Sequence, residues 1–571
     1  MDLSEPGSII FEREKFLSAN STFVNGNQET TATEAEAEEE NDDSSDEQIF
    51  LPGDSEEDDD LIVISGKEYP KTGFEEIIEK IGMGKFQKRL LWLCGFGWFA
   101  DNLWFQATSI ILPRVQTHFQ VSNSIIGLLP SSIILGMMFG AIFWGVFSDT
   151  FGRKQAFNWT LAMTAMFGLI SSLSQNFTQI CISMFFLGAS VGGNLPVDGA
   201  IFLEFVPKDK QYLLTFMSVF WPFGSVVTSV IAYFILPPFS CPENGTTSCD
   251  VHTHNNGWKY LLAICGTITF IMFISRILFF RLRESPKFLI VRNRKQEAVD
   301  VLREIARING RDISIHVSDL TTSGSDDRTV LPMTYPFLSS VKQPHKKKFT
   351  NPASFLRNCI SLKLQEIRPL FTPKWIRTTI LVWLFWSLNS VAFNMFNTFL
   401  PKFLENQETR NESNNDSSKV ITEVLKDYII FSICGVPGSL IGTYLIETPL
   451  GRIYTMSLGA FGSSLSVFLF AIFDSRAWSI TCNVLFNILN IIEYSVIYGY
   501  TAEVFETRVR GTANGIASAC ARVAGMAGPI IAGNLLAISI TLPLYVSAAA
   551  FFLVGVCMIS LPIETRGRQA L

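Results

Sequence analysis

The sequence predicts an all-α integral membrane fold with twelve transmembrane helices in two pseudo-symmetric six-helix bundles. Three observations predict it: an apolar composition, twelve apolar runs of membrane-spanning length, and a charged pattern that recurs in both halves of the chain. Apolar residues make up 48% of the 571 residues and charged residues only 17%, with a mean hydropathy of +0.28. Such a composition is typical of a membrane protein rather than of a string of soluble domains.

A transmembrane helix needs about 20 mostly apolar residues. Runs of this kind lie at residues 90–112, 125–147, 155–174, 179–203, 212–236 and 258–280, and then at 375–400, 427–446, 454–473, 477–500, 512–538 and 540–561. We therefore expect an N-terminal bundle over residues 84–280 and a C-terminal bundle over 375–562. No cleavable signal sequence precedes the first run, which is expected to direct its own insertion.

Residues 1–83 are expected to form a disordered, acidic, cytoplasmic tail. Residues 28–60 contain 16 Asp or Glu and no Lys or Arg, and such a composition cannot bury a core. Glu57, Leu61 and Ile62 fit the acidic dileucine pattern that sorting adaptors read, which slightly favours a vacuolar or endosomal membrane over the plasma membrane. Without these 16 charges the formal net charge of −7 becomes +9 for the remaining chain.

Positive charges orient the helices. Lys and Arg are enriched in cytoplasmic loops, and basic residues directly follow both the second and the sixth apolar run. Both termini, the short tail at residues 563–571 and the central loop at residues 281–374 are therefore expected in the cytoplasm. The central loop contains an amphipathic stripe near residues 297–308, which predicts a helix lying on the inner leaflet or on the inner face of the protein.

The opposite side of the membrane is marked by sequons and cysteines. Asn244, Asn411 and Asn415 lie in N-x-[ST] sequons in two loops that the orientation places outside the cytoplasm, where glycosylation is expected. Cys241 and Cys249 share the first of these loops, and their compartment and spacing predict a disulfide bond. The ten cysteines of the chain form no CxxC metal-binding spacing.

A charged pattern recurs at one spacing in the two halves. The distance from glycine to glutamate is 52 residues in both sets, which are Gly152, Arg153, Glu204 and Gly451, Arg452, Glu503. Parallel six-helix repeats are typical of two-bundle secondary transporters. We expect the acidic and basic residues of both sets, together with Asp149 and Arg510, to form ion pairs that act as a cytoplasmic gate.

The first set lies in the short turn between the second and third runs. Gly152 is expected to adopt a positive φ at this turn, and Gly145 to allow close packing of helices. Asp149 is expected to accept hydrogen bonds from a neighbouring helix N-terminus or to pair with an arginine.

Ionisable residues deep within a transmembrane run are functional candidates, because they are costly to insert. Asp101 lies about half way along the first run. It is expected to couple transport to protons or to neutralise a cationic substrate, since a carboxyl group removed from water can exchange a proton near neutral pH. The alternative is a hydrogen bond that only packs two helices.

Further polar residues predict a central substrate site. Asp198, Glu493 and Arg522 are candidates for binding a substrate or for a charge pair in which Asp198 or Glu493 faces Arg522. A helix presents residues i and i+4 on one face, which places Asn194 beside Asp198 and Asn490 beside Tyr494. The expected lining also includes Asn102, Trp221 and Asn389.

The stretch GxxxDxxGRK, from Gly145 to Lys154, resembles the signature loop of the major facilitator superfamily. Residues 500–503 with 510–511, 283–286 and 562–567 are similar to the sugar-porter-like branch. Residues 192–198 with 204–205, and 521–523, resemble the fungal relatives of the synaptic vesicle protein SVOP. The resemblance extends from about residue 84 to the C-terminus and implies the major facilitator fold.

The chain departs from the family pattern at Thr150 and Gln211, where arginine is usual, and at Thr448, where the second half would repeat Asp149. These departures imply an asymmetric gate. The seventh run lacks the paired glutamines of hexose carriers, so hexose is disfavoured as a substrate.

We therefore expect a secondary active transporter of a small organic solute (a carboxylate, an organic cation or a sugar-like compound), coupled to protons and working by alternating access. The alternative is a non-transporting, transporter-like receptor or a vesicle or organelle membrane component. The sequence contains no nucleophile–base pair, metal-binding or nucleotide-binding motif. We expect no enzymatic activity, no cofactor and no nucleic-acid partner, with the proton gradient as the driving force.

Overall fold

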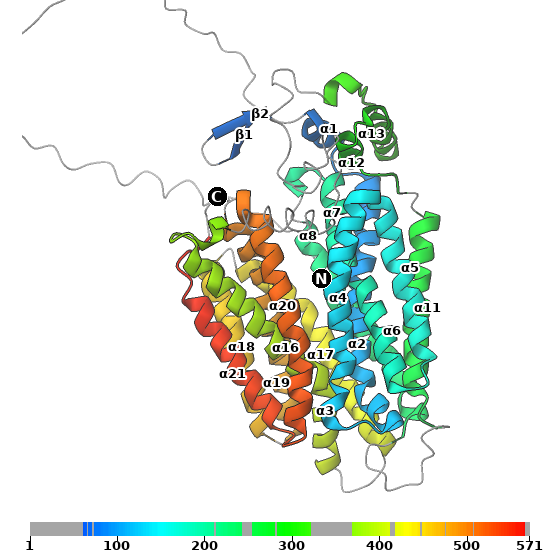
Figure 1. The fold of residues 1–571 in the computed structure, drawn as a ribbon, viewed down its shortest axis with the longest axis vertical. Coiled ribbons are helices and arrows are strands. Elements are labelled where there is room, and N and C mark those ends of the chain that lie inside the picture. The colour runs from blue at the N-terminus through cyan, green and yellow to red at the C-terminus, as the bar shows by residue number, and fades with distance from the viewer. Residues whose placement is uncertain are drawn as a thin grey trace, which may run out of the picture. The chain divides into compact units, whose positions relative to one another are not determined.

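The computed structural model describes residues 61–64, 67–70, 73–210, 213–241, 254–279, 282–320, 368–411, 417–445, 448–473, 475–505 and 507–565. Helices dominate these ranges (Figure 1). A two-stranded antiparallel hairpin, β1 (Leu61–Ile64) and β2 (Lys67–Pro70), precedes them in the chain. Asn244, Asn415, Cys249, Gln211 and Glu57 lie outside the described residues, as do the side chains of Leu61, Ile62, Asn411 and Arg510, so the predictions made for them stay predictions.

The N-terminal bundle contains six membrane helices, three of which are interrupted. Its elements are α2 (Lys85–Phe119), α3 (Asn123–Ile126) with α4 (Leu128–Phe151), α5 (Arg153–Ser172), α6 (Phe177–Val191) with α7 (Asn194–Phe205), α8 (Leu213–Phe216) with α9 (Phe220–Ile235), and α11 (Gly257–Phe279). Between α6 and α7, Gly192 and Gly193 allow α4 to approach closely, because an added Cβ would overlap the Met137 backbone or the Trp144 ring.

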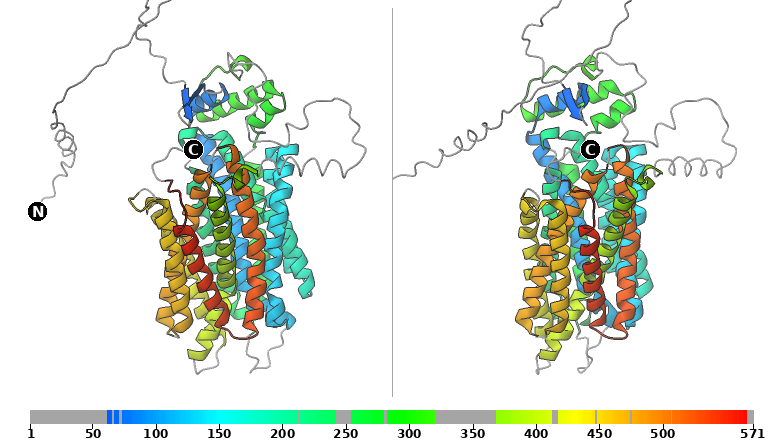
Figure 2. Two further views of the ribbon diagram at one scale, coloured as in Figure 1. Left: turned by 60° about the vertical axis from the view of Figure 1, so that its left-hand side comes forward. Right: turned by 90° about the vertical axis from the view of Figure 1, so that its left-hand side faces the viewer.

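The C-terminal bundle contains α16 (Ile376–Asn411), α17 (Ser417–Leu445), α18 (Gly451–Ile472), α19 (Arg476–Val504), α20 (Thr507–Leu536) and α21 (Leu542–Ile559). The two bundles meet where α2 contacts α16, α3 and α4 contact α20, and α9 contacts α17. The long helices run alongside one another (Figure 2). The predicted all-α fold of two six-helix bundles is confirmed, and all twelve predicted runs fall on helices.

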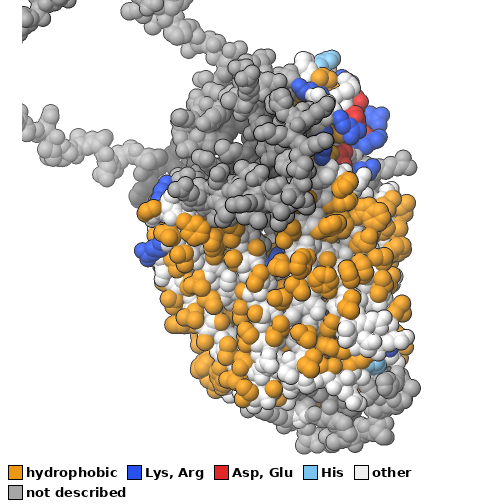
Figure 3. All heavy atoms as spheres, in the orientation of Figure 1, with side chains coloured by type: hydrophobic (Ala, Val, Ile, Leu, Met, Phe, Trp, Pro, Cys, Tyr) orange, Lys and Arg blue, Asp and Glu red, His pale blue; other side chains and the backbone are white. Residues whose placement is uncertain are grey.

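Ten helices of the described part of the chain are long and apolar enough to cross a membrane. The other two predicted runs, residues 90–112 and 155–174, lie in α2 and α5, which carry more polar residues. These polar side chains face the protein interior: Asp101 and Gln106 of α2 and Thr160 and Thr164 of α5 are all buried. Apolar side chains instead cover the outer surface of the helices (Figure 3), as expected for a protein surrounded by lipid.

Three short helices form a cap at one end of the N-terminal bundle: α1 (Gly73–Ile81), α12 (Pro286–Val291) and α13 (Lys295–Asn309). We call this the cap end and the opposite end, where α3 lies, the far end (Figure 1). The predicted amphipathic helix is α13. Its buried residues Leu302 and Ile305 share a core cluster with Ile77 and Ile81 of α1, so its apolar face packs on protein.

The expected disorder of residues 1–83 is wrong for its last part, because α1 begins at Gly73. Isoleucines recur on one face of α1 outside the acidic stretch, and this face is buried against α13. Asn309 of α13 attaches the cap to the start of α2. Its Oδ1 accepts a hydrogen bond from the Phe86 amide at 3.0 Å, and its Nδ2 donates to Gln87 Oε1 at 2.9 Å. The cap is therefore anchored to the N-terminal bundle.

Candidate functional site

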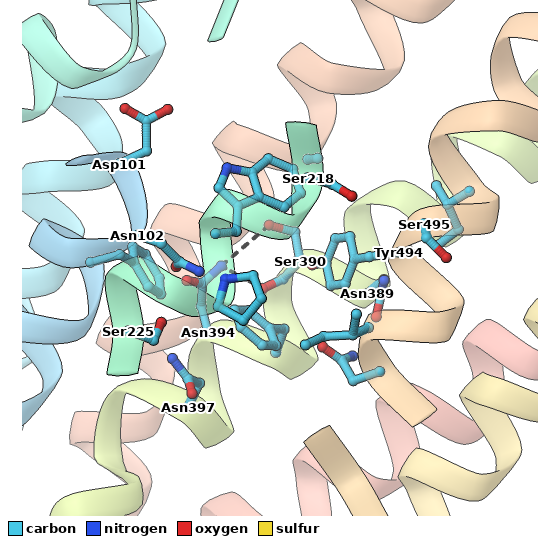
Figure 4. Close-up of a pocket in the computed structure, with 18 of the residues that line it drawn as sticks. Asp101, Asn102, Ser218, Ser225, Asn389, Ser390, Asn394, Asn397, Tyr494 and Ser495 are labelled. Atoms are coloured by element: carbon cyan, nitrogen blue, oxygen red, sulfur yellow. Dashed lines mark hydrogen bonds between the residues drawn. The ribbon is translucent and has the colours of Figure 1, made fainter. Parts of the chain in front are cut away.

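A cavity of about 310 Å³ lies between the two bundles. Both bundles line it, through α2, α4, α7 and α9 on one side and α16, α17, α19 and α20 on the other (Figure 4). Its wall is rich in asparagine, serine and aromatic side chains and includes one carboxylate and one guanidinium, Asp101 and Arg522. Among the described residues, no cluster of His, Cys, Asp or Glu is arranged to hold a metal ion.

The structure brings seven of the ten expected site residues to this cavity: Asp101, Asn102, Trp221, Asn389, Asn490, Tyr494 and Arg522. Asn194, Asp198 and Glu493 do not line it. Serines and further asparagines, including Ser225, Ser390, Asn394 and Asn397, belong to the lining without having been expected there (Figure 4). Sequence reasoning missed them because uncharged polar residues are also common in helix contacts.

Asp101 lies on α2 and is 9% exposed. Its Oδ1 accepts a hydrogen bond from Nδ2 of Asn194 at 2.9 Å. Asn194 is fully buried at the start of α7, where the break after α6 brings its side chain toward α2. Asn194 therefore orients Asp101 and does not itself line the cavity.

Arg522 lies on α20 of the C-terminal bundle and reaches α4 of the N-terminal bundle. Its Nη1 donates a hydrogen bond to the Met137 carbonyl at 2.6 Å. No carboxylate of the described residues pairs with it. Asp101 and Arg522 therefore stand on opposite bundles, in one cavity, without forming an ion pair.

Asp198 pairs with Arg276 of α11 rather than with Arg522. Both side chains are fully buried, and Arg276 Nη2 donates to Asp198 Oδ2 at 2.8 Å. Arg276 also donates to the Leu93 and Phe157 carbonyls and lies 3.7 Å from the centroid of the Phe157 ring. The expected pair is wrong because Arg276, a single arginine inside the sixth apolar run, was not considered as a partner within the same bundle.

Glycine at position 97 makes room for this ion pair, since an added Cβ would overlap Asp198 Oδ2. We expect Gly97→Ala to destabilise the protein by about 1–3 kcal/mol, the usual cost of overpacking. The matched control is Gly145→Ala, because a Cβ at Gly145 would meet no atom within 4 Å. Melting temperatures of the two variants in detergent should differ clearly. Equal melting temperatures would contradict this account of Gly97.

The same open space at Gly145 corrects the expectation that this glycine allows close helix packing. Neighbouring glycines of α4 do so instead: an added Cβ at Gly136 or Gly140 would overlap the backbone of α6.

Glu493 is fully buried on α19, and neither of its carboxylate oxygens has a hydrogen-bond partner among the described residues. Successive residues of a helix are rotated by about 100°, so Asn490 and Tyr494 face the cavity while Glu493 points toward α18. There an added Cβ at Gly459 would lie 2.9 Å from Glu493 Cβ. Glu493 is therefore not a cavity residue, and no pair with Arg522 forms.

The repeated charged sets form two matching clamps at the cap end. Arg153 pairs with Asp149 at 2.8 Å and with Glu204 at 3.3 Å, and the Arg153 amide donates to Glu284 Oε1 at 2.7 Å. Gly152 precedes the helix with a φ of 116°, as expected for a glycine turn. Glu284 fills the space beside this glycine, where an added Cβ would overlap its carboxylate.

The second clamp repeats this geometry in the C-terminal bundle. Arg452 pairs with Glu503 at 3.1 Å, and Glu564 accepts hydrogen bonds from the Arg452 and Ile453 amides at 3.0 and 2.9 Å. Gly451 has a φ of 69°. Thr448, in place of a second Asp149, donates to the Leu445 carbonyl at 2.6 Å, which makes the two clamps unequal.

The described contacts of each clamp lie within one bundle, and the expectation that these pairs act as a cytoplasmic gate stays a prediction. The roles of Glu284 and Glu564 were missed. Each accepts amide hydrogen bonds from the start of a helix, but they follow their arginines by 131 and 112 residues, and this unequal spacing hides the repeat.

Charged side chains join the bundles at the far end, in what we call the far-end latch. Arg114 of α2 forms a buried ion pair with Glu405 of α16. Lys402 of α16 donates to Gln116 Oε1 at 2.6 Å and to Asn123 Oδ1 at 2.8 Å. Charges near the ends of apolar runs usually mark the membrane boundary, which is why the sequence did not reveal them as partners.

The latch also involves the loop after α9. Arg114 Nη1 donates to the Cys241 carbonyl at 2.6 Å, and Cys241 is disulfide-bonded. Its pairing with Cys249 stays a prediction.

Four aromatic rings cross between the bundles on the cap side of the cavity. Trp98 stacks on Trp221 at 5.2 Å, Trp221 lies 6.2 Å from Tyr498, and Tyr498 meets Trp386 edge-on at 4.9 Å. Trp98 lies one turn closer to the cap than Asn102 on α2. We call these four rings the aromatic ladder, and three of them, Trp221, Trp386 and Tyr498, line the cavity.

The fold and this cavity define the class: a multi-pass integral membrane protein whose two helical bundles enclose a site for a small molecule. The family profile described as Major Facilitator Superfamily matches residues 91–501 and 428–570. The chain belongs to this superfamily.

Curated relatives and solved structures agree with this assignment. The MFS siderochrome iron transporter 1 of Ceriporiopsis subvermispora is 36% identical over 504 residues, covering 86% of this chain and 90% of the relative. The Synaptic vesicle 2-related protein of Xenopus laevis is 26% identical over 511 residues, covering 86% and 81%. The xylose transporter XylE from E. coli, in a partially occluded inward open conformation, shares the fold with a TM-score of 0.61 at 15% identity, covering 85% and 99%.

Proposed function

We propose that the protein is a secondary active transporter that moves a small organic solute through the cavity between its bundles, coupled to protons. The observation that carries this proposal is a cavity lined by both bundles, with a carboxylate from one and a guanidinium from the other. A site shared by two rigid halves changes as the halves rock, which is the basis of alternating access. Transporters are also what the names of the relatives describe.

The contacts between the bundles suggest how access alternates. In this proposal the far-end latch closes one side of the cavity, and the aromatic ladder lies on the other side. Basic residues around the cap support a cytoplasmic position for the cap end, by the positive-inside rule. In this assignment the latch faces the exterior or an organelle lumen, and its release would open the cavity on that side.

Asp101 is the residue we assign to proton coupling. It is buried in the membrane, its one described hydrogen-bond partner is the neutral Asn194, and it lines the cavity. A proton bound to Asp101 therefore changes the charge of the site directly. Glu493, whose carboxylate has no hydrogen-bond partner among the described residues, lies outside the cavity and has no direct path to the solute.

The substrate classes that suit the wall are a carboxylate, an organic cation and a sugar-like compound, since asparagines and serines bind hydroxyl or carboxyl groups and Asp101 attracts a cation. The volume is near the lower limit for small-molecule sites, which favours a solute of modest size. The dileucine motif supports a vacuolar or endosomal membrane, reached through a sorting adaptor, over the plasma membrane.

Replacing Asp101 by asparagine is expected to uncouple solute binding from pH. Coupling between two ligands typically changes affinity about 5- to 150-fold, so the wild type should bind its solute differently at pH 5.5 and pH 7.5 by such a factor. The variant should show less than about a twofold change, because asparagine cannot titrate. Purified protein in liposomes containing pyranine would report proton entry on adding benzoate, choline or xylose.

The matched control is Asp300→Asn, an exposed aspartate on the cap, which should leave proton entry unchanged. Persistent coupling in Asp101→Asn would move the proton site elsewhere and direct attention to Glu493. Binding of a solute without any uptake by the wild type would favour the alternative, a transporter-like receptor or vesicle component.

A further inference from the structure

We infer that the cavity binds a small planar monocarboxylate, and that Arg522 is the residue that holds its carboxylate group. This inference rests on the proposed function, because it names the substrate class of the same cavity. The charge and shape of the cavity wall favour one of the three proposed substrate classes, the carboxylate, over the organic cation and the sugar-like compound.

The first argument is the state of the buried arginines. Arg114, Arg153 and Arg276 are buried, and each is paired with a carboxylate. Arg522 lies in the cavity wall inside the membrane, but it donates only Nη1, to a backbone carbonyl. A guanidinium has five N–H donors, so most of the donors of Arg522 have no acceptor among the described residues.

Arg522 is partly exposed to the cavity, and a guanidinium in the membrane interior without an adjacent counter-charge is unfavourable. A ligand that brings a negative charge to Arg522 supplies both the charge and the missing acceptors. The planar fork of arginine matches the two oxygens of a carboxylate. No second basic residue lines the described cavity, so the site suits one negative charge rather than a doubly charged phosphate.

The second argument is the shape and polarity of the remaining wall. Trp221, Trp386 and Tyr498 line the cavity, and Phe105 stacks with Phe393 across the two bundles at 6.3 Å. Aromatic faces bind planar ring systems well. A ring held between these side chains can direct its carboxylate to Arg522.

Asp101 explains why binding of a carboxylate at this site would require a proton. When ionised, Asp101 repels a carboxylate in the same cavity; when protonated, it does not. The ionisable side chains of the cavity are Asp101, Arg522, Tyr494 and Tyr498, and no other ionisable group of the described residues lines it. Behind Asp101, Asp198 and Arg276 neutralise each other. Proton and carboxylate are therefore expected to bind together, so benzoate affinity should rise as the pH falls.

The test is calorimetric titration of the purified full chain with three ligands of similar shape: benzoate, neutral benzamide and cationic benzylamine. Benzoate should bind at pH 5.5 at least tenfold more tightly than either analogue. Arg522→Gln should weaken benzoate binding about 10- to 100-fold, the range for a charged hydrogen bond left unmade. Arg522→Lys keeps the positive charge but lacks the planar guanidinium, so its affinity for benzoate should lie between those of the wild type and of Arg522→Gln.

The control variant is Arg283→Gln, since Arg283 is exposed on the cap and, among the described residues, pairs with Glu304 at the surface. It should bind benzoate like the wild type. Melting temperatures of all variants would establish that weak binding is not caused by unfolding.

Benzoate that fails to bind at either pH, binds Arg522→Gln as tightly as the wild type, or binds more weakly than benzylamine overturns the inference. The same measurements distinguish failure of this inference from failure of the proposed transport function. If choline or xylose is taken up with proton entry while benzoate does not bind, transport stands and the carboxylate site falls. If benzoate binds through Arg522 but is not taken up, the carboxylate site stands and transport falls.

Discussion

Replacing Arg276 by methionine is expected to destabilise the protein by about 3–5 kcal/mol, the cost of removing one partner from a buried ion pair. Asp198 would keep its negative charge inside the N-terminal bundle with no cation beside it, since both side chains are fully buried. The hydrogen bonds from Arg276 to the Leu93 and Phe157 carbonyls would be lost as well. Most of the variant should aggregate at temperatures that the wild type tolerates, measured by size exclusion after stepwise heating in detergent.

The double variant Asp198→Asn, Arg276→Met separates the charge from the packing. It removes the unpaired carboxylate, so it should recover much of the lost stability. Arg283→Met is the matched control, because its exposed ion pair is expected to contribute less than about 1 kcal/mol. A single variant as stable as the wild type, or a double variant less stable than the single one, would contradict the assigned role of the pair.

Replacing Glu405 by glutamine is expected to open the cavity at the far end. The variant leaves Arg114 buried without its carboxylate and weakens the contact between α2 and α16. The same 3–5 kcal/mol then penalises only the conformation in which the latch is closed. A cysteine placed at Ser225 in the cavity wall should react with a membrane-impermeant maleimide from that side at least tenfold faster in Glu405→Gln than in the wild-type background.

The control for this experiment is Glu423→Gln at the same end of the molecule. Glu423 pairs with Lys426 and with Arg476, and all three belong to the C-terminal bundle. Its loss should leave the reaction of the cavity cysteine unchanged. If Glu405→Gln also leaves it unchanged, the Arg114–Glu405 pair holds the structure together without controlling access.

The fold could be predicted from the sequence because a membrane imposes one requirement on every helix, a long apolar run. The requirement is weaker where a helix is surrounded by protein. Helix α5, which is too polar to meet this requirement, contains the buried residues Thr160 and Thr164. Thr164 donates a hydrogen bond to the Thr160 carbonyl of the same helix at 2.8 Å. Such residues lower the hydropathy of a run without preventing it from crossing the membrane.

The candidate site was predictable as a set of residues but not as a set of contacts. Spacing along a helix shows which residues share a face, so Asn490 and Tyr494 were correctly placed together on the cavity wall. Spacing does not show how a helix is rotated against its neighbours. That rotation points Glu493 toward α18, and it lets Arg276 rather than Arg522 reach Asp198.

The contacts between the bundles were the least predictable feature. Arg114 and Glu405 are separated by 291 residues, and the local sequence around either residue does not indicate that the other is its partner. Their pairing depends on how the two bundles pack against each other, and the proposed rocking of the bundles would separate the same two helices.

The aromatic ladder gives the protein an optical property that can be used without any label. Trp221 and Trp386 belong both to the ladder and to the cavity wall. Indole emission shifts in wavelength and intensity with the polarity and the quenching groups around the ring. Solvent entering the cavity, a solute filling it or the bundles moving apart would each change that environment, so intrinsic fluorescence reports on the site in the native chain.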